Sequence, residues 1–144
     1  MSSSGGRAWQ ALLELLRLEK AHRSSLFAPY DLTPQLGHAI YCIAEDGLTM
    51  RELSTELMCD ASNATGIVDR LEKRGLVERS PDPEDRRIKR VFLTAAGKRM
   101  RETLEEIILT PPPSIAALST SEQTALRTIL ERAIAEAERL RSSA

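Results

Sequence analysis

Aromatic residues are scarce in this chain: only 3% of its 144 residues are Phe, Trp or Tyr. A hydrophobic core must therefore consist mainly of Leu, Ile, Val and Ala, and this length suffices for one domain with such a core. No apolar run approaches the roughly 20 residues of a membrane-spanning helix, and the first residues do not have the pattern of a secretion signal. We therefore expect a cytoplasmic protein that does not enter the membrane.

Cysteine and histidine are also rare. The two cysteines, Cys42 and Cys59, form neither a disulfide framework nor a metal-binding spacing, and a reduced protein is the default for such a chain. The two histidines, His22 and His38, fall on different predicted helices. Serine, threonine and aspartate are plentiful but form no nucleophile motif. These absences predict a protein that is not an enzyme and that binds neither a metal nor a cofactor.

A large net charge is missing as well, because the formal value for the whole chain is only −1. The distribution is uneven, however: residues 70–101 contain eleven Lys or Arg and five Asp or Glu, a net charge of +6, and the remainder has a net charge of −7. A concentrated positive region on an acidic protein is typical of a nucleic-acid-binding face. The alternative is a solvated surface whose charges are unevenly distributed.

The stretch from Leu48 to Thr94 predicts two short helices followed by a hairpin. The first helix begins with a capping box, in which Thr49 and Glu52 satisfy each other's backbone N–H groups. The second begins at Asp60 or Ser62 and places apolar residues at positions i, i+3, i+4 and i+7, so that one face is buried. The residues of this buried face are Ala64, Ile67, Val68 and Leu71.

A charged hairpin follows the second helix. Gly75 ends the helix where a left-handed residue is favoured, and residues 76–80 and 88–93 are predicted to be strands. The turn between them, residues 81–87, contains two prolines and five charged residues. Two short helices followed directly by a hairpin with a basic tip are typical of a winged helix-turn-helix that reads duplex DNA.

This arrangement resembles the MarR family of transcriptional regulators. Residues 60–72 resemble the recognition helix of that family, and residues 82–94 resemble its wing signature, in which Asp-x-Arg is followed by Leu-Thr. The signature residues are Asp85, Arg87, Leu93 and Thr94. The resemblance covers most of the chain and implies a mainly α fold with a small β-hairpin wing: a winged helix-turn-helix with N- and C-terminal dimerisation helices.

The segment before this region is also predicted to be helical. An amphipathic helix over residues 9–27 ends at Pro29, and Ser2–Gly6 in front of it is expected to be a disordered tail. Thr33 caps the next helix, and Gly47 is expected to close it.

Two further helices are predicted after the wing. Thr94 caps the first, which the proline run 111–113 ends, and Ser119 and Glu122 form a capping box for the last. The first and last helices of the chain have more apolar surface than so small a body can cover. This favours a dimer interface formed by the two termini over packing of the helices within one subunit.

The family resemblance implies the same assembly, a homodimer whose terminal helices intertwine. We therefore expect residues 1–144 to form a single MarR-like domain. Its winged-helix DNA-binding lobe should span residues 33–103, and residues 7–32 and 104–144 should form a helical dimerisation lobe.

Candidates for DNA contact lie on the second helix and at the wing tip. Short polar side chains suit base edges, and basic side chains suit phosphates. The resemblance implies that Arg87 enters the minor groove and that Asp85 holds it, whereas the alternative is a solvated ion pair. The predicted DNA-binding residues are Ser62, Asn63, Thr65, Gly66, Arg70, Lys73, Arg74, Asp85, Arg86 and Arg87.

Some of these positions have a second interpretation. Helix capping is the alternative for Ser62 and Asn63. A glycine inside a helix, such as Gly66, costs about 1 kcal/mol relative to alanine, which close approach to DNA or to the neighbouring helix would explain. Three further basic residues are expected to line the DNA backbone or stay solvated: Arg79, Lys89 and Arg90.

MarR-like regulators often bind a small aromatic or phenolic effector between the dimerisation helices and the DNA-binding lobe, and the resemblance implies one here. The candidate lining residues are Trp9, His22, Arg23, His38, Tyr41 and Cys42, most of which have the alternative role of core or interface residues. The family also contains thiol-based oxidant sensors with a reactive cysteine in the first helix, where this chain has none. Both cysteines are expected to be inert packing residues.

The sequence therefore predicts a homodimeric regulator that binds double-stranded DNA at a palindrome and represses nearby genes until a small ligand releases it. Two alternatives remain at this point: a regulator switched by thiol oxidation, and a winged helix used as a protein–protein module.

Overall fold

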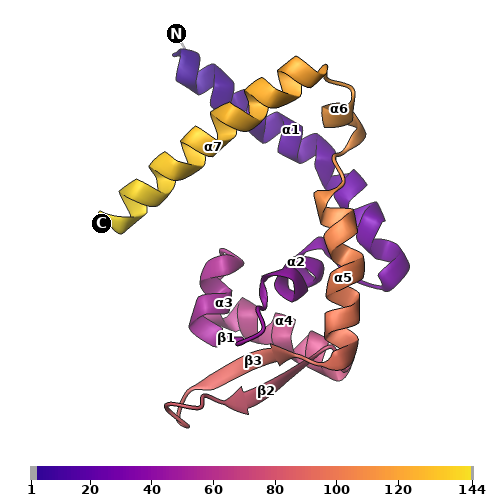
Figure 1. Cartoon of the computed structure of the whole chain (residues 1–144), viewed down its shortest axis with the longest axis vertical. Coiled ribbons are helices and arrows are strands. Elements are labelled where there is room, and N and C mark those ends of the chain that lie inside the picture. The colour runs from indigo at the N-terminus through magenta and orange to yellow at the C-terminus, as the bar shows by residue number, and fades with distance from the viewer. Residues whose placement is uncertain (1–2, 144) are drawn as a thin grey trace. The chain divides into compact units, whose positions relative to one another are not determined.

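Helices dominate the chain, and three strands form a small sheet (Figure 1). The computed structural model describes residues 3–143 and divides into two units, one up to Thr110 and one from Pro111 onwards. The elements of the first unit are α1 (Ser4–Phe27), the 3-10 helix η1 (Ala28–Tyr30), α2 (Pro34–Cys42), β1 (Leu48–Thr49), α3 (Met50–Glu56), α4 (Ala61–Lys73), β2 (Val77–Pro81), β3 (Lys89–Leu93) and α5 (Ala95–Leu109). The second unit contains α6 (Pro113–Ala116) and α7 (Thr120–Ser142). Across the described residues, no helix has both the length and the apolar character that a membrane span requires.

Side-chain caps fix the starts of the predicted helices. The oxygen of each capping side chain accepts a hydrogen bond from a backbone N–H in the first turn, which satisfies one of the free donors there. The predicted caps that are confirmed are Thr33, Thr49, Asp60, Thr94 and Ser119. The capping boxes of α3 and α7 are also confirmed, with Glu52 and Glu122 returning a carboxylate to the capping residue.

Two predicted boundaries are wrong. Residues 3–6 are not a disordered tail: α1 begins at Ser4, because the Ser3 hydroxyl caps it by accepting from the Gly6 N–H at 3.0 Å. Ser2 lies outside the described residues. Gly47 does not close α2, which ends at Cys42. It instead lies in the turn before β1 with φ of 71°, where a Cβ would come within 2.8 Å of the Val91 carbonyl oxygen.

The sheet has three antiparallel strands in the order β1-β3-β2. The register pairs Val77 with Leu93 in the hairpin, and Leu48 with Val91 at the other edge of β3. The two hairpin strands confirm the predicted wing: β2 is shifted by one residue at both ends, and β3 begins one residue later than predicted and ends as predicted. The two-residue strand β1 was not predicted, because it is too short to show a periodic pattern. The β2–β3 turn projects beyond helices α2, α3 and α4 (Figure 1).

One apolar core joins these elements within the first unit. Helices α2, α3 and α4 pack against one another, and α5 packs against α2 and β3. At Gly97 a Cβ would come within 1.9 Å of the Leu76 carbonyl oxygen. Helix α5 therefore packs closely against the backbone directly before β2. The buried core residues are Phe27, Leu32, Leu36, Ala39, Ile40, Ile43, Leu53, Leu57, Ile67, Val68, Leu71, Leu76, Val77, Val91, Leu93 and Leu104.

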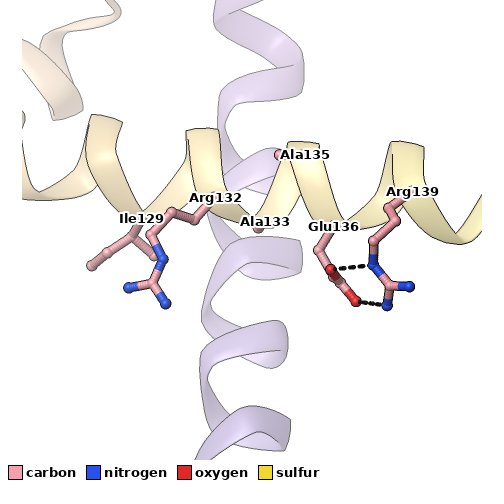
Figure 2. A pocket seen from close by; sticks show the side chains of 6 residues that line it. All are labelled: Ile129, Arg132, Ala133, Ala135, Glu136 and Arg139. Atoms are coloured by element: carbon pink, nitrogen blue, oxygen red, sulfur yellow. Dashed lines mark hydrogen bonds and ion pairs between the residues drawn. The ribbon is translucent and has the colours of Figure 1, made fainter.

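The first and last helices leave large apolar side chains exposed. Phe27 is the one buried residue described in α1, and none is buried among the described residues of α7. The exposed apolar side chains of α1 are Trp9, Leu13, Leu16 and Leu18, and those of α7 are Ile129, Leu130, Ile134 and Leu140. Figure 2 shows the side chains that line a hollow along α7, among them Glu136 and Arg139, which form an ion pair. Each helix thus has an apolar surface that the described residues leave accessible.

Candidate nucleic-acid interface

Helix α4 separates an apolar inner face from a polar outer face. The predicted inner residues are all buried: Ala64, Ile67, Val68 and Leu71. The carboxylate of Asp60 caps the helix by accepting from the Asn63 N–H at 2.7 Å. Since Asp60 supplies the cap, the Ser62 and Asn63 side chains are not used for that purpose. Both are exposed, together with Thr65 in the next turn.

Gly66 leaves an open position in the middle of this outer face. A Cβ placed there would meet no atom within 4 Å. Packing against a neighbouring helix therefore does not explain the glycine, which removes one of its two predicted explanations. The other, close approach of DNA to the helix backbone, stays a prediction.

The basic residues of α4 differ in what they contact. The Arg70 Nε donates to the Gly66 carbonyl at 3.2 Å, and the side chain is exposed. Lys73 is exposed in the last turn and forms no ion pair among the described residues. Arg74 donates to the backbone carbonyls of Tyr30 and Asp31 and so joins the end of α4 to the turn after α1. Its predicted phosphate contact remains untested, but its guanidinium already has a structural role.

The wing tip presents one guanidinium in a defined orientation. Arg87 donates from Nε to Asp85 Oδ1 and from Nη2 to Asp85 Oδ2, both at 3.1 Å, and its backbone N–H donates to Oδ1 as well. The Arg87 side chain is nevertheless 91% exposed. The hydrogen bonds from the Arg87 side chain and backbone hold the pKa of the Asp85 carboxyl below its usual value. The predicted partnership of Asp85 with Arg87 is therefore present, and Arg86 is exposed beside it.

Two basic residues of the hairpin differ from the prediction that they line DNA or stay solvated. Arg79 pairs with Asp69 at 2.5 Å and with Glu72 at 2.7 Å, which joins β2 to the outer side of α4. Arg90 is only 18% exposed and contacts Asp82. Carboxylate and carbonyl oxygens on neighbouring elements accept hydrogen bonds from these two guanidinium groups. The Lys89 side chain, in contrast, is exposed, as predicted.

The six predicted effector residues are not gathered around one cavity. On α2, the Cys42 Sγ lies 3.5 Å from the His38 Nε2 one turn away. Burial and the nearby Glu56 raise the pKa of the Cys42 thiol. On α1, Trp9 is exposed, and His22 is half-buried. Arg23 alone among the six lines a hollow of about 480 Å³ between α1, the start of α2 and α4.

Sequence reasoning missed most of the residues around this hollow. They are Leu16, Lys20, Arg23, Ser24, Thr33, Pro34, Gln35 and Arg70. Three are cationic, and no acidic residue lines the hollow among the described residues. The charges of Lys20 and Arg23, spaced three residues apart on one helix face, were the signal available in the sequence.

The sequence and the structure of this chain are both similar to those of known transcriptional regulators. A sequence model of the MarR family matches residues 32–89. The HTH-type transcriptional regulator YfiV of Bacillus subtilis is 30% identical over 144 residues, covering 96% of this chain and 90% of the relative. The transcriptional repressor MprA of Escherichia coli is 36% identical over 95 residues, covering 62% of this chain and 51% of the relative.

A solved structure of a probable transcriptional regulator from Pseudomonas aeruginosa aligns with a TM-score of 0.66 and 34% identity. The alignment covers 82% of this chain and 92% of that one. Several curated relatives extend beyond the matched part: the chain spans 66% of the B. subtilis regulator YsmB and 44% of the Methylorubrum extorquens regulator TtmR.

Proposed function

Because this chain belongs to the MarR family of winged helix-turn-helix transcriptional regulators, we propose that it binds a palindromic operator as a homodimer and represses transcription until a small ligand releases it. The family consists of DNA-binding regulators and not of enzymes. The observation that supports the proposal most is the exposed polar face of α4 beside a wing tip that presents Arg87. The repressor role follows the name of MprA.

In this proposal each exposed group of α4 and the wing has a separate task on DNA. Ser62, Asn63 and Thr65 contact base edges in the major groove, where short polar side chains can donate and accept. Gly66 allows the helix backbone to approach the DNA closely. Arg70, Lys73 and Arg86 neutralise phosphates. Arg87 enters the adjacent minor groove, whose negative potential is strongest where the groove is narrow.

The function is tested by incubating the full-length protein with random genomic fragments and sequencing those it retains. We expect a palindrome whose half-site centres are about one helical turn, ~34–36 Å, apart, as two-fold regulators of this kind require. Retention of no preferred sequence at moderate salt, where non-specific phosphate binding is weakened, would contradict the proposal. That result would favour the alternative use of the winged helix as a protein–protein module.

The proposed lobes rest on the exposed apolar surfaces of α1 and α7. We retain the DNA-binding lobe over residues 33–103 and the dimerisation lobe over residues 7–32 and 104–144. Contiguous apolar surface on a soluble protein commonly marks an interface, and a second copy of the chain is the partner that a palindromic operator requires.

The residues that line the hollow beside Arg23 support a proposal for the class of effector. Its size suits a small organic molecule. Lys20, Arg23 and Arg70 supply positive charge, the first turn of α2 adds the favourable end of a helix dipole, and Leu16 supplies an apolar wall. We propose that the effector is a small organic anion with an apolar ring. Because Arg70 is also a proposed phosphate contact, a bound anion would compete with DNA for the same guanidinium.

We expect benzoate, as a first probe, to weaken operator binding of the full-length protein, whereas neutral benzamide should not. Effector coupling is typically about 5- to 150-fold, and operator must weaken benzoate binding by the same factor. Arg23→Gln should abolish the benzoate effect. The matched control is Arg17→Gln on the same helix, because Arg17 pairs with Glu14 and does not line the hollow. Benzoate that binds equally well with and without operator is not an effector, however tightly it binds.

The thiol-switch alternative is less favoured. A reactive cysteine needs a lowered pKa and access to the oxidant, whereas burial raises the pKa of the half-buried Cys42 thiol. The only other cysteine of the chain is Cys59, which precedes α4.

A further inference from the structure

Arg90, on β3 close to the turn of the wing, lies near the start of α3. Its guanidinium donates from Nε to the Asp46 carbonyl at 3.1 Å and from Nη2 to the Gly47 carbonyl at 3.2 Å. Nη2 also lies 3.8 Å from Oε2 of Glu52, the carboxylate that closes the capping box of α3. A single side chain on β3 thus contacts the turn before β1 and the first turn of α3.

The remaining arm of the same guanidinium reaches towards the wing tip. Arg90 Nη1 donates to Asp82 Oδ2 at 3.1 Å, and the Asp82 side chain is only 14% exposed. The other oxygen, Asp82 Oδ1, accepts from the N–H groups of Glu84 and Asp85 at 2.8 and 3.1 Å. Asp85 in turn holds the Arg87 guanidinium with both of its carboxylate oxygens. Hydrogen bonds therefore lead from the carbonyls of the turn before β1, through Arg90 and Asp82, to Asp85 and Arg87 at the tip.

We propose that Arg90 is a positioning residue for DNA recognition, which fixes the wing tip through Asp82 so that Arg87 meets the minor groove already oriented. This inference rests on the proposed minor-groove role of Arg87. It assigns Arg90 no DNA contact of its own, because its guanidinium is largely covered and each arm has an acceptor within the protein. Preorganisation of this kind increases affinity by reducing the side-chain entropy lost on binding.

The shape of the arginine side chain is what this role requires. A planar guanidinium presents donors in a rigid fork, whereas a lysine ammonium is a point charge on a flexible stem. Arg79 provides an internal comparison on the other strand of the hairpin. It also forms two ion pairs, but with Asp69 and Glu72 of α4, and it contacts no residue of the tip among the described residues.

The test is a double-mutant cycle on the affinity of the full-length protein for its selected operator. Arg90→Gln should weaken binding roughly three- to tenfold per half-site, the cost of ordering a loosened side chain on binding. It should cost little more once Arg87→Ala is present, because the oriented residue is gone. Arg79→Gln is the matched control, since it removes the same charge from the same hairpin, and its effect should not depend on Arg87. Equal effects of Arg90→Gln in both backgrounds would overturn the proposal.

The Arg90→Lys variant distinguishes the contribution of the positive charge from that of the guanidinium shape. We expect this variant to lose nearly as much operator affinity as Arg90→Gln, because it keeps the charge but not the fork. Asp82→Asn interrupts the same path from the tip side and should also lose its effect in the Arg87→Ala background. If Arg90→Lys binds operator as tightly as the parent, charge alone explains the residue and the positioning role is wrong.

A measurement without DNA distinguishes this inference from the proposed minor-groove contact. NMR order parameters report backbone motion on the picosecond to nanosecond timescale, and those of the Glu84 and Asp85 amides should fall in Arg90→Gln but not in Arg79→Gln. If Arg87→Ala leaves operator affinity unchanged, the minor-groove contact fails, yet a fall in these values would still show that Arg90 orders the tip. Unchanged order parameters in Arg90→Gln would overturn the positioning role itself.

Discussion

Replacing Arg87 with alanine is expected to weaken operator binding by about 5- to 150-fold per half-site, the range typical of one specific arginine contact. The fold and the oligomeric state should be unchanged, because the side chain is 91% exposed and its partner is a neighbour in the same turn. The dependence of affinity on salt should also flatten, by roughly one unit of slope per phosphate-neutralising charge lost in each subunit. Titrations of the operator at several salt concentrations, with circular dichroism as the control for folding, measure both effects.

The matched substitution at Asp85 separates two interpretations of the same ion pair. Removal of a negative charge near DNA should tighten binding if Asp85 is merely part of a solvated turn. If it orients Arg87 through charge-assisted hydrogen bonds, Asp85→Ala should weaken binding instead. We expect weaker binding at fixed salt. Tighter binding by the Asp85→Ala protein would show that the orienting role is wrong.

A charged residue in the apolar stripe of α7 is expected to abolish the proposed dimer and with it high-affinity operator binding. Ile134 is 57% exposed in the isolated chain, so Ile134→Glu should not disturb the packing within one subunit. In a dimer interface it would bury an unpaired charge, which costs several kcal/mol. Sedimentation of the variant at micromolar concentration should show a monomer, and its affinity for the palindrome should fall to the non-specific level.

The control for this prediction lies on the same helix. At 100° per residue, Thr128 falls on the side of α7 opposite the stripe formed by Ile129, Leu130 and Ile134. Thr128→Glu introduces the same charge and should leave the dimer intact. A dimeric Ile134→Glu protein with full operator affinity would rule out this face of α7 as the interface.

Helix starts, buried faces and the hairpin could be predicted from the sequence because each depends on residues close together in the chain. A cap and its acceptor N–H lie within one turn, as at Thr49 and Asp60, and the buried face of α4 follows from residue spacing alone. The two wrong boundaries also have local causes, which the residue types at these positions did not reveal. Ser3 caps a segment whose glycines suggested disorder, and Gly47 serves a close approach to β3 instead of a helix end.

Contacts between distant segments could not be predicted in this way. Arg90 reaches carbonyls 43 and 44 residues away, as does Arg74, and nothing in the adjacent sequence distinguishes either from a solvated arginine. The charge count of residues 70–101 was therefore correct, but it overestimated how many of these basic side chains are available to DNA. Arg74, Arg79 and Arg90 each have acceptors within the protein.

The contact of Arg74 has a mechanical consequence for any change of state. Its guanidinium clamps the last turn of α4 to the carbonyls of Tyr30 and Asp31, where the chain leaves α1 with Asp31 in a left-handed conformation. The Arg74 guanidinium thus links the segment just after α1 to the end of α4. If α1 rotates when a ligand binds the proposed dimer, we expect this link to pass part of the movement to α4 and so to change the spacing between the two proposed recognition helices.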